Sequence, residues 1–571
     1  MRHGRVAAML RARLVRYAGL AGSLLLALAA QMGGATRPWQ PTMTPRSVFA
    51  GTDGVLLPLS WLLGTVLLIG AWWLGRAAVP SLRWAYVTAA LWTVPLLPVL
   101  PLGSYDVYSY ACQGYALAAG HDPYAAGVSV LGCPWADAVA PTWRDSPAPY
   151  GPVFLLLAAA AARLGGGLAG TVAVLRGLAV LGVVLVGACL PVLARRHGVP
   201  PERAAWLVLA CPLVAVHLVA GAHNDAVMVG LLVAGLAVAA TVGAAAPGSR
   251  LGRPVVRVGL LAGAGVLLGL AVGVKVTAIV VLPFAVLAAA GAVPGGRRAE
   301  RVLLQPDEAL LEPDEALLEP DEALLEPDEA LLEPDEALLQ PDEAQLQPDQ
   351  ALLEPDQALL RADGSALSSA LPPGDRAPLR ALWGPGAVLA AGAAGALAAV
   401  SLAAGLGFGW VRNLADSGVS VQWTSPPTAV GLSVSSLARV FGVEVETVPV
   451  TRLLGVAALA VVLVVLWWRA RSGRALLGAG LALAATVALA PVFHPWYLTW
   501  PLAVLAATAA GAHRWLVATC AMAAALCLPD GYNLALATRV QGAFAVTALL
   551  IVMLVVRLVR ARRRVADGTG S

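Results

Sequence analysis

Charged residues are scarce in this chain of 571 residues. They make up 13% of it, whereas 59% of the residues are hydrophobic and the mean hydropathy is +0.76. A soluble domain carries about 25% charged and about 45–50% apolar residues. The shortage of charge excludes a soluble globular enzyme and a disordered protein. It predicts an all-α integral membrane protein, in which each span needs about 20 apolar residues.

Lysine and cysteine are also rare. Lys275 is the single lysine, and the six cysteines include no CxxC pair. This pattern excludes a disulfide scaffold and offers no zinc-ligand spacing. Cys112 and Cys133 share one loop and would pair if that loop faces an oxidising compartment. We expect no metal and no resident cofactor, although clustered carboxylates leave a divalent cation open.

Nucleotide-binding and hydrolase motifs are absent from the sequence. There is no Walker loop, Rossmann fingerprint, GxSxG elbow or HExxH pair. Nothing therefore points to a nucleotide-dependent reaction on the cytoplasmic side of a membrane, or to a nucleic acid as partner.

What the chain does contain is a series of long apolar runs. Their lengths predict about 14 transmembrane helices. The approximate limits are 17–33, 55–74, 84–102, 171–194, 204–221, 226–244, 257–274, 276–294, 385–406, 452–468, 475–493, 497–512, 514–529 and 542–560. A further apolar stretch, 152–168, follows several prolines, and we interpret it as a half-inserted or interfacial helix.

The basic residues divide unevenly between the two sets of connections. One set holds 28 of them and the opposite set holds eight, including Lys275. The positive-inside rule then places both termini in the cytoplasm of a multi-pass plasma-membrane protein. Of the 15 acidic residues outside 305–360, ten face the extracytoplasmic side. They gather in loops and at helix ends, which favours a site at the outer membrane surface over a mid-membrane transport site.

A heptapeptide repeat, PDEALLE, occupies residues 305–360. This segment holds 19 of the 34 acidic residues and no lysine or arginine. A proline in every heptad argues against a coiled coil, because each proline removes a helix hydrogen bond. We interpret 295–384 as a solvated cytoplasmic insert between a transmembrane half at 1–294 and another at 385–571. A docking role for the acidic strip is the alternative.

The first large outer loop, 103–151, is the richest in polar and aromatic residues. Asp106 follows an apolar run by a few residues, so its carboxylate should lie at the membrane surface. A partly desolvated carboxylate there can serve as a general base toward a substrate hydroxyl. The structural alternative is that Ser104 or Asp106 caps a helix through Tyr110.

Other candidate residues lie beside Asp106 or at outer helix junctions, and each has a structural alternative. Turn residues, helix caps and interfacial aromatic anchors account for many such positions. Lys275 and His494 are candidate phosphate contacts, since a cation or donor on the side poor in basic residues suits an anion. The candidate substrate-binding residues are Tyr105, Tyr108, Asp122, Tyr124, Tyr150, His223, Asn224, Asp225, Lys275, His494, Trp496 and Tyr497.

Five segments together resemble a known enzyme family. In order, they read SYDVYSYACQGYALAAGHDPYAAG, APYGPVFLLL, GAHNDAVMVGLLVAG, GVKVTAIVVLPF and HPWY. The pattern is similar to that of the actinobacterial polyprenol-phosphate-mannose-dependent alpha-1,6-mannosyltransferases, which are GT-C-type membrane glycosyltransferases. It covers about 84–300 and 385–510. The repeat at 305–360 departs from the family.

This resemblance implies a fold and a reaction. It implies a GT-C-like bundle whose extracytoplasmic loops, 103–151 and 407–450, form the active site. Mannose would pass from a polyprenyl-phosphate-mannose to a mannan or lipoglycan acceptor, with inversion to an alpha-1,6 linkage. Asp106 matches the proposed base, while Asn224 and Asp225 would hold sugar hydroxyls or orient that base.

Two other functions remain open at the level of sequence. One is a GT-C transferase that uses another lipid-phosphate sugar, such as an arabinofuranosyl donor. The other is a transporter or flippase for a lipid-linked saccharide, which predicts polar residues at mid-span and an internal repeat.

Overall fold

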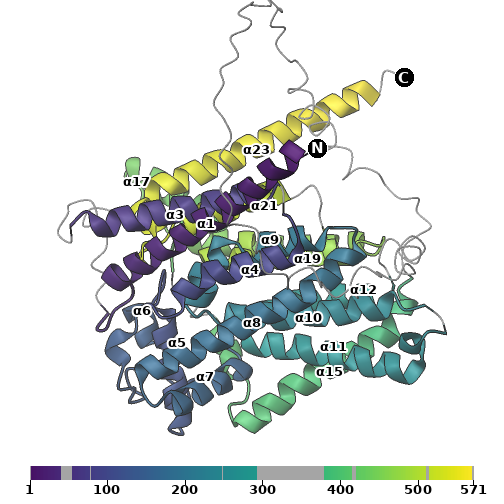
Figure 1. The fold of residues 1–571 in the computed structure, drawn as a ribbon, viewed down its shortest axis with the longest axis horizontal. Coiled ribbons are helices and arrows are strands. Elements are labelled where there is room, and N and C mark those ends of the chain that lie inside the picture. Colours follow the sequence, from purple (N-terminus) through teal and green to yellow (C-terminus); the bar gives the residue numbers. More distant parts are fainter. Residues whose placement is uncertain are drawn as a thin grey trace, which may run out of the picture. The chain divides into compact units, whose positions relative to one another are not determined.

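The computed structural model describes residues 2–39, 54–77, 79–246, 248–291, 378–414, 420–508 and 513–568. Within these ranges the chain is built from helices, and the only strand-like pairing is one isolated bridge between Cys527 and Asn533. Figure 1 shows this all-helical architecture. The predicted fold class is therefore confirmed. The repeat at 305–360 lies outside the described residues, as does nearly all of the insert predicted at 295–384.

Eight helices of the described chain are long and apolar enough to cross a membrane. They are α1 (Arg2–Gly33), α3 (Leu56–Gly75), α8 (Leu168–Arg196), α10 (Asp225–Gly243), α11 (Pro254–Val274), α15 (Arg380–Ala404), α18 (Val448–Ala470) and α23 (Arg539–Gly568). A ninth span results if α9 (Pro201–Leu209) and the π-helix η3 (Val214–Ala220), which meet at 61°, are counted as one.

The predicted count of about 14 spans is not confirmed. The remaining runs do form helices, but these are short: α4 (Leu82–Thr93), η1 (Val94–Leu96), η5 (Val276–Val281), α12 (Leu282–Ala289), α19 (Ala475–Leu489), η10 (Pro495–Leu498), α20 (Thr499–Leu505) and α21 (His513–Ala524). Prolines inside the runs, such as Pro95, Pro212 and Pro283, interrupt the helical hydrogen bonds.

Small residues let the central helices approach closely. Helix α10 packs between α8 and α11, and α11 packs on α15. A Cβ atom added at Gly182 of α8 would lie 2.3 Å from the carbonyl oxygen of Ala226, and one at Gly265 of α11 would lie 2.2 Å from that of Leu389. These glycines therefore allow backbone contact between helices, as is common in membrane bundles.

The first long loop, 103–151, which is predicted to be extracytoplasmic, is partly helical. It contains α5 (Asp106–Ala118), η2 (Ala136–Ala138) and α6 (Pro141–Arg144), and it leads into α7 (Pro152–Gly165). A disulfide between Cys112 and Cys133 links α5 to the segment before η2, so the pairing that the sequence left open is present. Helix α7 has 14 residues and rises about 21 Å, less than the thickness of the hydrocarbon core.

The second outer loop, predicted at 407–450, contains two helices, α16 (Gly409–Asn413) and α17 (Pro426–Val440). The Nδ2 atom of Asn413 donates to the carbonyl oxygens of Tyr124 and Ala148, at 3.2 and 3.1 Å. Trp410 is buried with Tyr124 in a small apolar cluster. The two outer loops are thus packed against each other, which fixes the first loop around Asp106.

Candidate active site

Asp106 is the first residue of α5. The Oγ atom of Ser104 accepts a hydrogen bond from the backbone N–H of Asp106 at 3.0 Å, but Tyr105 is the N-cap residue of α5 and its side chain makes no cap, so neither cap considered from the sequence is present. Gly103 has φ +75° and donates its N–H to the carbonyl of Pro529. This turn leaves the carboxylate of Asp106 partly open, with 20% of its side chain exposed.

His223 faces the carboxylate of Asp106 from another part of the chain. It lies in the turn between η3 and α10, and its Nε2 atom is 3.6 Å from Asp106 Oδ2. Its Nδ1 atom is 2.6 Å from the carbonyl oxygen of His217. The preceding residue, Ala222, has φ +51°, the one positive φ of a non-glycine residue in the described chain. Such strain is typical of functional sites.

Next to His223 lies a buried ion pair. The Nζ atom of Lys275 is 2.9 and 3.1 Å from the two carboxylate oxygens of Asp225. The indole N–H of Trp500 donates to the same carboxylate at 2.7 Å. Lys275 also lies over the rings of Tyr497, at 4.2 Å, and Trp500, at 5.1 Å. The charge of Lys275 is therefore shared between a carboxylate and two aromatic faces.

Trp496 joins these groups into one cluster. Its ring is stacked on His494 with centroids 4.7 Å apart, and it lies 4.0 Å from the ring of His223 and 5.3 Å from that of His217. His494 also contacts Tyr497, which lies under Lys275. The HPWY motif thus connects the Asp106–His223 pair to the Lys275–Asp225 pair.

Asn224 and Tyr150 complete the wall around Asp106. Asn224 is buried, and neither its amide oxygen nor its amide nitrogen has a protein partner among the described residues. The ring of Tyr150 packs edge-on against Tyr110, which in turn contacts His223. An unpaired buried amide is expensive unless a ligand or water satisfies it. Asn224 is therefore well suited to a substrate hydroxyl or phosphate oxygen.

Four candidate residues lie elsewhere. The hydroxyl of Tyr108 donates to the carbonyl of Ala35 at 2.6 Å, and that of Tyr105 accepts from the N–H of Thr36. Both tyrosines thereby tie the start of α5 to the segment after α1.

Asp122 forms a turn, accepting from the N–H of Tyr124 at 2.8 Å, and the hydroxyl of Tyr124 donates to the carbonyl of Tyr150. Asp122 and Tyr124 therefore shape the loop around Tyr150 and hold its backbone in place. The structure brings together the other candidates, from His223 to Tyr497, around Asp106.

Electrostatics favour an ionised Asp106. Burial raises the pKa of this carboxyl, but the contact with His223 and the neighbouring His494 and Lys275 outweigh burial and hold the pKa below its usual value. For Lys275, burial lowers the pKa, but Asp225 and Tyr497 outweigh burial and the pKa lies above its usual value. Asp106 and Lys275 are therefore both charged at neutral pH.

The HPWY motif supplies neutral groups. Burial lowers the pKa of His494 to about 4, although Asp106 opposes this, so its imidazole is uncharged at neutral pH. Burial raises the pKa of Tyr497 to about 12, with Lys275 acting in the opposite direction. His494 can therefore donate a single hydrogen bond, and Tyr497 presents a neutral ring and hydroxyl.

Three site residues escaped the sequence reasoning. Trp500 and His217 sit in apolar runs, where an aromatic ring or a lone histidine is more often core than site. Ala222 carries no chemistry of its own, and only its backbone conformation marks it. The spacing of Trp500 from Trp496, one helical turn, was the signal available for adding it to the HPWY motif.

Two regions of the chain match models of protein families. Residues 16–291 match the family model described as "Alpha-(1->6)-mannopyranosyltransferase, N-terminal domain", and residues 427–558 match the "MptB C-terminal domain". No solved structure matches the chain. The two matched regions lie on either side of the acidic repeat.

Curated relatives come from mycobacteria and corynebacteria. The chain is 29% identical to alpha-(1->6)-mannopyranosyltransferase A of Mycobacterium tuberculosis, over 88% of this chain and 81% of the relative. It is 27% identical to alpha-(1->6)-mannopyranosyltransferase B of Corynebacterium glutamicum, over 76% and 60%. It is 32% identical to alpha-(1->6)-mannopyranosyltransferase A of the same organism, over 42% and 48%.

Proposed function

The chain belongs to the actinobacterial alpha-(1->6)-mannopyranosyltransferase family, and on that premise we propose how it works as an alpha-1,6-mannosyltransferase. The donor is a polyprenyl-phosphate-mannose, and the acceptor is a mannan or lipoglycan. The reaction takes place on the extracytoplasmic side of the plasma membrane and inverts the anomeric configuration. Asp106 is the general base.

The position of Asp106 is the observation that carries this proposal. Its carboxylate is partly exposed, ionised at neutral pH and near Tyr150. It faces His223, whose ring contacts Trp496 and whose neighbour in sequence, Asn224, has an unpaired amide. A general base must reach the proton that it removes. An open carboxylate at the start of α5 meets this requirement for the 6-hydroxyl of a mannoside.

In the proposed step, the acceptor oxygen attacks the anomeric carbon while its proton moves to Asp106. The bond between the anomeric carbon and the phosphate oxygen breaks, and the electron pair leaves with the lipid phosphate. This leaving group needs hydrogen-bond donors or positive charge more than a proton. Asn224 and the neutral His494 can donate to it, and Lys275 contributes charge that it shares with Asp225.

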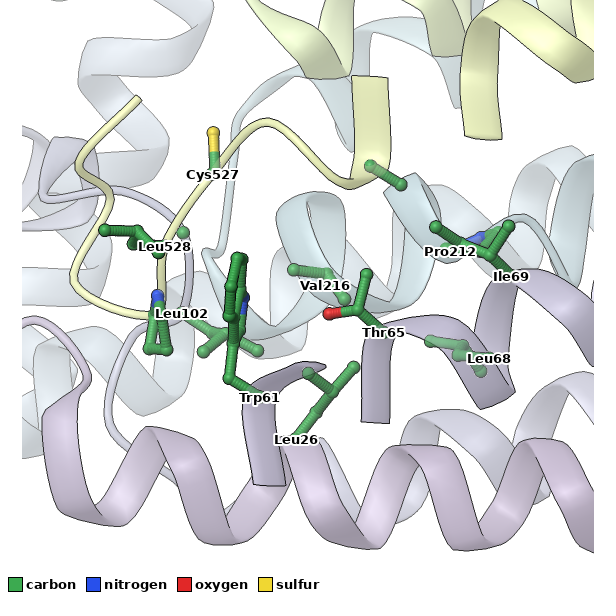
Figure 2. Close-up of a pocket in the computed structure, with 13 residues that line it drawn as sticks. Leu26, Trp61, Thr65, Leu68, Ile69, Leu102, Pro212, Val216, Cys527 and Leu528 are labelled. Atoms are coloured by element: carbon green, nitrogen blue, oxygen red, sulfur yellow. The ribbon is translucent and has the colours of Figure 1, made fainter. Parts of the chain in front are cut away.

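A small apolar pocket lies beside the site. Figure 2 shows it between α1, α3, the π-helix η3 and the segment after α21. It reaches Gly103, three residues before Asp106, and Val216, which precedes His217. Its wall is otherwise apolar apart from Thr65, with Trp61, Leu68 and Leu528 among the lining residues. Its volume of about 20 Å³ is room for about one water molecule, so this pocket is too small for an isoprenoid unit.

Two observations support an extracytoplasmic site. The connections on the opposite side hold most of the arginines, as cytoplasmic connections do. The loop that carries Asp106 contains the Cys112–Cys133 disulfide, and structural disulfides form on oxidising sides of membranes. Both termini are then cytoplasmic, as the sequence predicts.

The test is mannosyl transfer in right-side-out vesicles supplied with polyprenyl-phosphate-mannose and a membrane-impermeant short alpha-1,6-mannoside. We expect wild type to transfer mannose and Asp106→Asn to be at least about 100-fold slower, because a general base contributes about 10²–10⁴-fold. The variant should be present at the same level, since asparagine keeps the shape of the carboxylate.

Equal rates in both proteins would exclude Asp106 as the base. Transfer that requires inverted vesicles would contradict the outer location. Inactivity of wild type with this donor, together with transfer from another lipid-phosphate sugar, would contradict the donor assignment.

A further inference from the structure

This inference rests on the proposed function and concerns the charge of His223, whose imidazole can be neutral or protonated. We propose that His223 is held as an imidazolium, protonated on both ring nitrogens, and that this cation positions Asp106 and keeps it ionised. His223 is then a positioning residue that acts through Asp106. The inference rests on the geometry of the Asp106–His223 pair.

The hydrogen bond to His217 fixes one proton of the His223 ring. A backbone carbonyl oxygen can only accept, so Nδ1 of His223, at 2.6 Å, must carry a hydrogen and donate it. The strained φ of +51° at Ala222 turns the chain so that this bond can form. In the neutral ring, Nε2 would therefore be the unprotonated nitrogen.

An unprotonated Nε2 conflicts with its neighbour. Nε2 is 3.6 Å from Asp106 Oδ2, so in that tautomer a nitrogen lone pair would face a carboxylate lone pair. One proton between the two groups removes this repulsion. A proton on Asp106 would disable it as a base, whereas a proton on His223 makes an ion pair and leaves Asp106 able to accept another.

The ring face of His223 also favours the cation. The centroid of Trp496 lies 4.0 Å away with the planes inclined by 37°, so the indole face covers the imidazole ring. A cation over an aromatic face is stabilised by about 0.5–2 kcal/mol. His223 has no exposed surface, and its ring is therefore held between the indole, the carbonyl and the carboxylate.

Among the residues that the structure describes, no other cation is paired with Asp106. Lys275, after α11, is paired with Asp225 of α10. His494, before η10, is neutral, and His217 of η3 faces the ring of His223 with centroids 6.1 Å apart. The tyrosines that face this region are Tyr110, Tyr150 and Tyr497. The two carboxylates of the site are thus in two pairs, Asp225 with Lys275 and Asp106 with His223.

The proton balance of the reaction fits this arrangement. The acceptor hydroxyl gives its proton to the free oxygen of Asp106, while His223 stays protonated. The departing phosphate takes the electron pair of the broken bond, and the proton on Asp106 leaves to water once the products separate. The imidazolium therefore never has to give up a proton during turnover.

The pH dependence of transfer by purified protein in lipid nanodiscs tests this role. Wild type should lose activity as the pH falls and Asp106 takes up a proton. Glutamine at position 223 can still donate a hydrogen bond but carries no charge. We expect His223→Gln to lower kcat by about 10–100-fold, with the KM for donor changed less than about twofold.

The pH at which activity falls on the acidic side of the profile, its acidic limb, tests whether His223 is charged. In His223→Gln the apparent pKa of this limb should rise by about one unit or more, a tenfold change in the proton affinity of Asp106. The matched control is His197→Gln, which removes a histidine at the end of α8 that contacts the carbonyl oxygen of Leu193, outside the site, and should leave the acidic limb in place. An acidic limb that stays unchanged in His223→Gln would overturn the proposal.

Infrared spectroscopy gives the same test without turnover. The protonated carboxyl band that is lost in Asp106→Asn identifies Asp106, and we expect this band to appear at higher pH in His223→Gln than in wild type. An unchanged titration would exclude the imidazolium role. If wild type fails to transfer mannose, the proposed function fails, while this spectroscopic measurement still decides the charge of His223.

Discussion

At the scale of single residues, the site depends on partners for its charges. Asp225 is fully buried, and its carboxylate is satisfied by Lys275 and Trp500. Removing one member of a buried pair leaves an uncompensated charge, which costs about 3–5 kcal/mol, whereas replacing both members by apolar groups is often neutral. Lys275 therefore has a structural duty in addition to any contact with phosphate.

Lys275→Met should lower the apparent melting temperature of the protein in nanodiscs by several degrees and reduce transfer. The double variant Lys275→Met with Asp225→Leu should regain most of the thermal stability, because no buried charge is left unpaired. Transfer should stay low in the double variant, since the charge near the leaving group is gone. Scanning fluorimetry and the mannosyl transfer assay measure the two effects. A single variant as stable as wild type would show that Asp225 finds another partner.

At the scale of helices, the site is held by links between segments that are distant in sequence. Arg176 of α8 donates to the carbonyl oxygens of Leu97 and Ala220, so it joins the end of η1 to the end of η3, just before His223. The disulfide fixes α5, whose first residue is Asp106. These links keep Asp106 and His223 facing each other, although Asp106 begins α5 and His223 follows η3.

Loss of the disulfide should weaken the outer loop without removing the chemistry. Cys112→Ala with Cys133→Ala should transfer mannose at moderate temperature but lose activity faster on heating, because a disulfide closing a loop of this length is worth about 3 kcal/mol. A membrane-permeant reductant should speed thermal inactivation of wild type and leave the double variant unaffected. If the reductant has equal effects on both proteins, the disulfide does not stabilise the loop.

At the scale of the whole molecule, the catalytic unit is divided by the acidic repeat. The chain separates into one unit of residues 1–294 with 375–571 and another of 295–374. Both family matches fall in the first unit. Helices α12 and α15, which flank the gap, contact each other, so a short connection suffices between them.

Replacing residues 301–372 by a short Gly/Ser linker should therefore leave mannosyl transfer within about twofold of wild type, since the contacts described for the site all join residues of the unit made of 1–294 and 375–571. The comparison is made in membranes at matched protein level. A loss of more than about tenfold in the linker variant would assign the repeat a role in catalysis or assembly. The same linker variant carrying Asp106→Asn controls for background transfer.

Composition and apolar runs predicted the fold class because a bilayer imposes length and polarity on every span. The predicted number of spans is not confirmed, because several apolar runs form helices that are short or, as at Pro212, bent. The place of Asp106 after an apolar run predicted it as a site residue, and the structure places it opposite His223. The contacts of His223 with Asp106 and of Trp500 with Asp225 were not predicted. They join residues more than 100 positions apart and depend on packing that a single sequence does not reveal.

The single lysine of the chain allows ligand binding to be followed by chemical labelling. Apart from an α-amino terminus, Nζ of Lys275 is the one primary amine of the chain, and it lies in the site with 14% of its side chain exposed. An acylating reagent that targets amines therefore reads a single internal position without any engineered label. The extent of acylation at Lys275, read as an increase in mass, would rise when the Lys275–Asp225 pair opens as donor or acceptor binds. A chain with a single lysine therefore allows this site to be followed by mass spectrometry without a label.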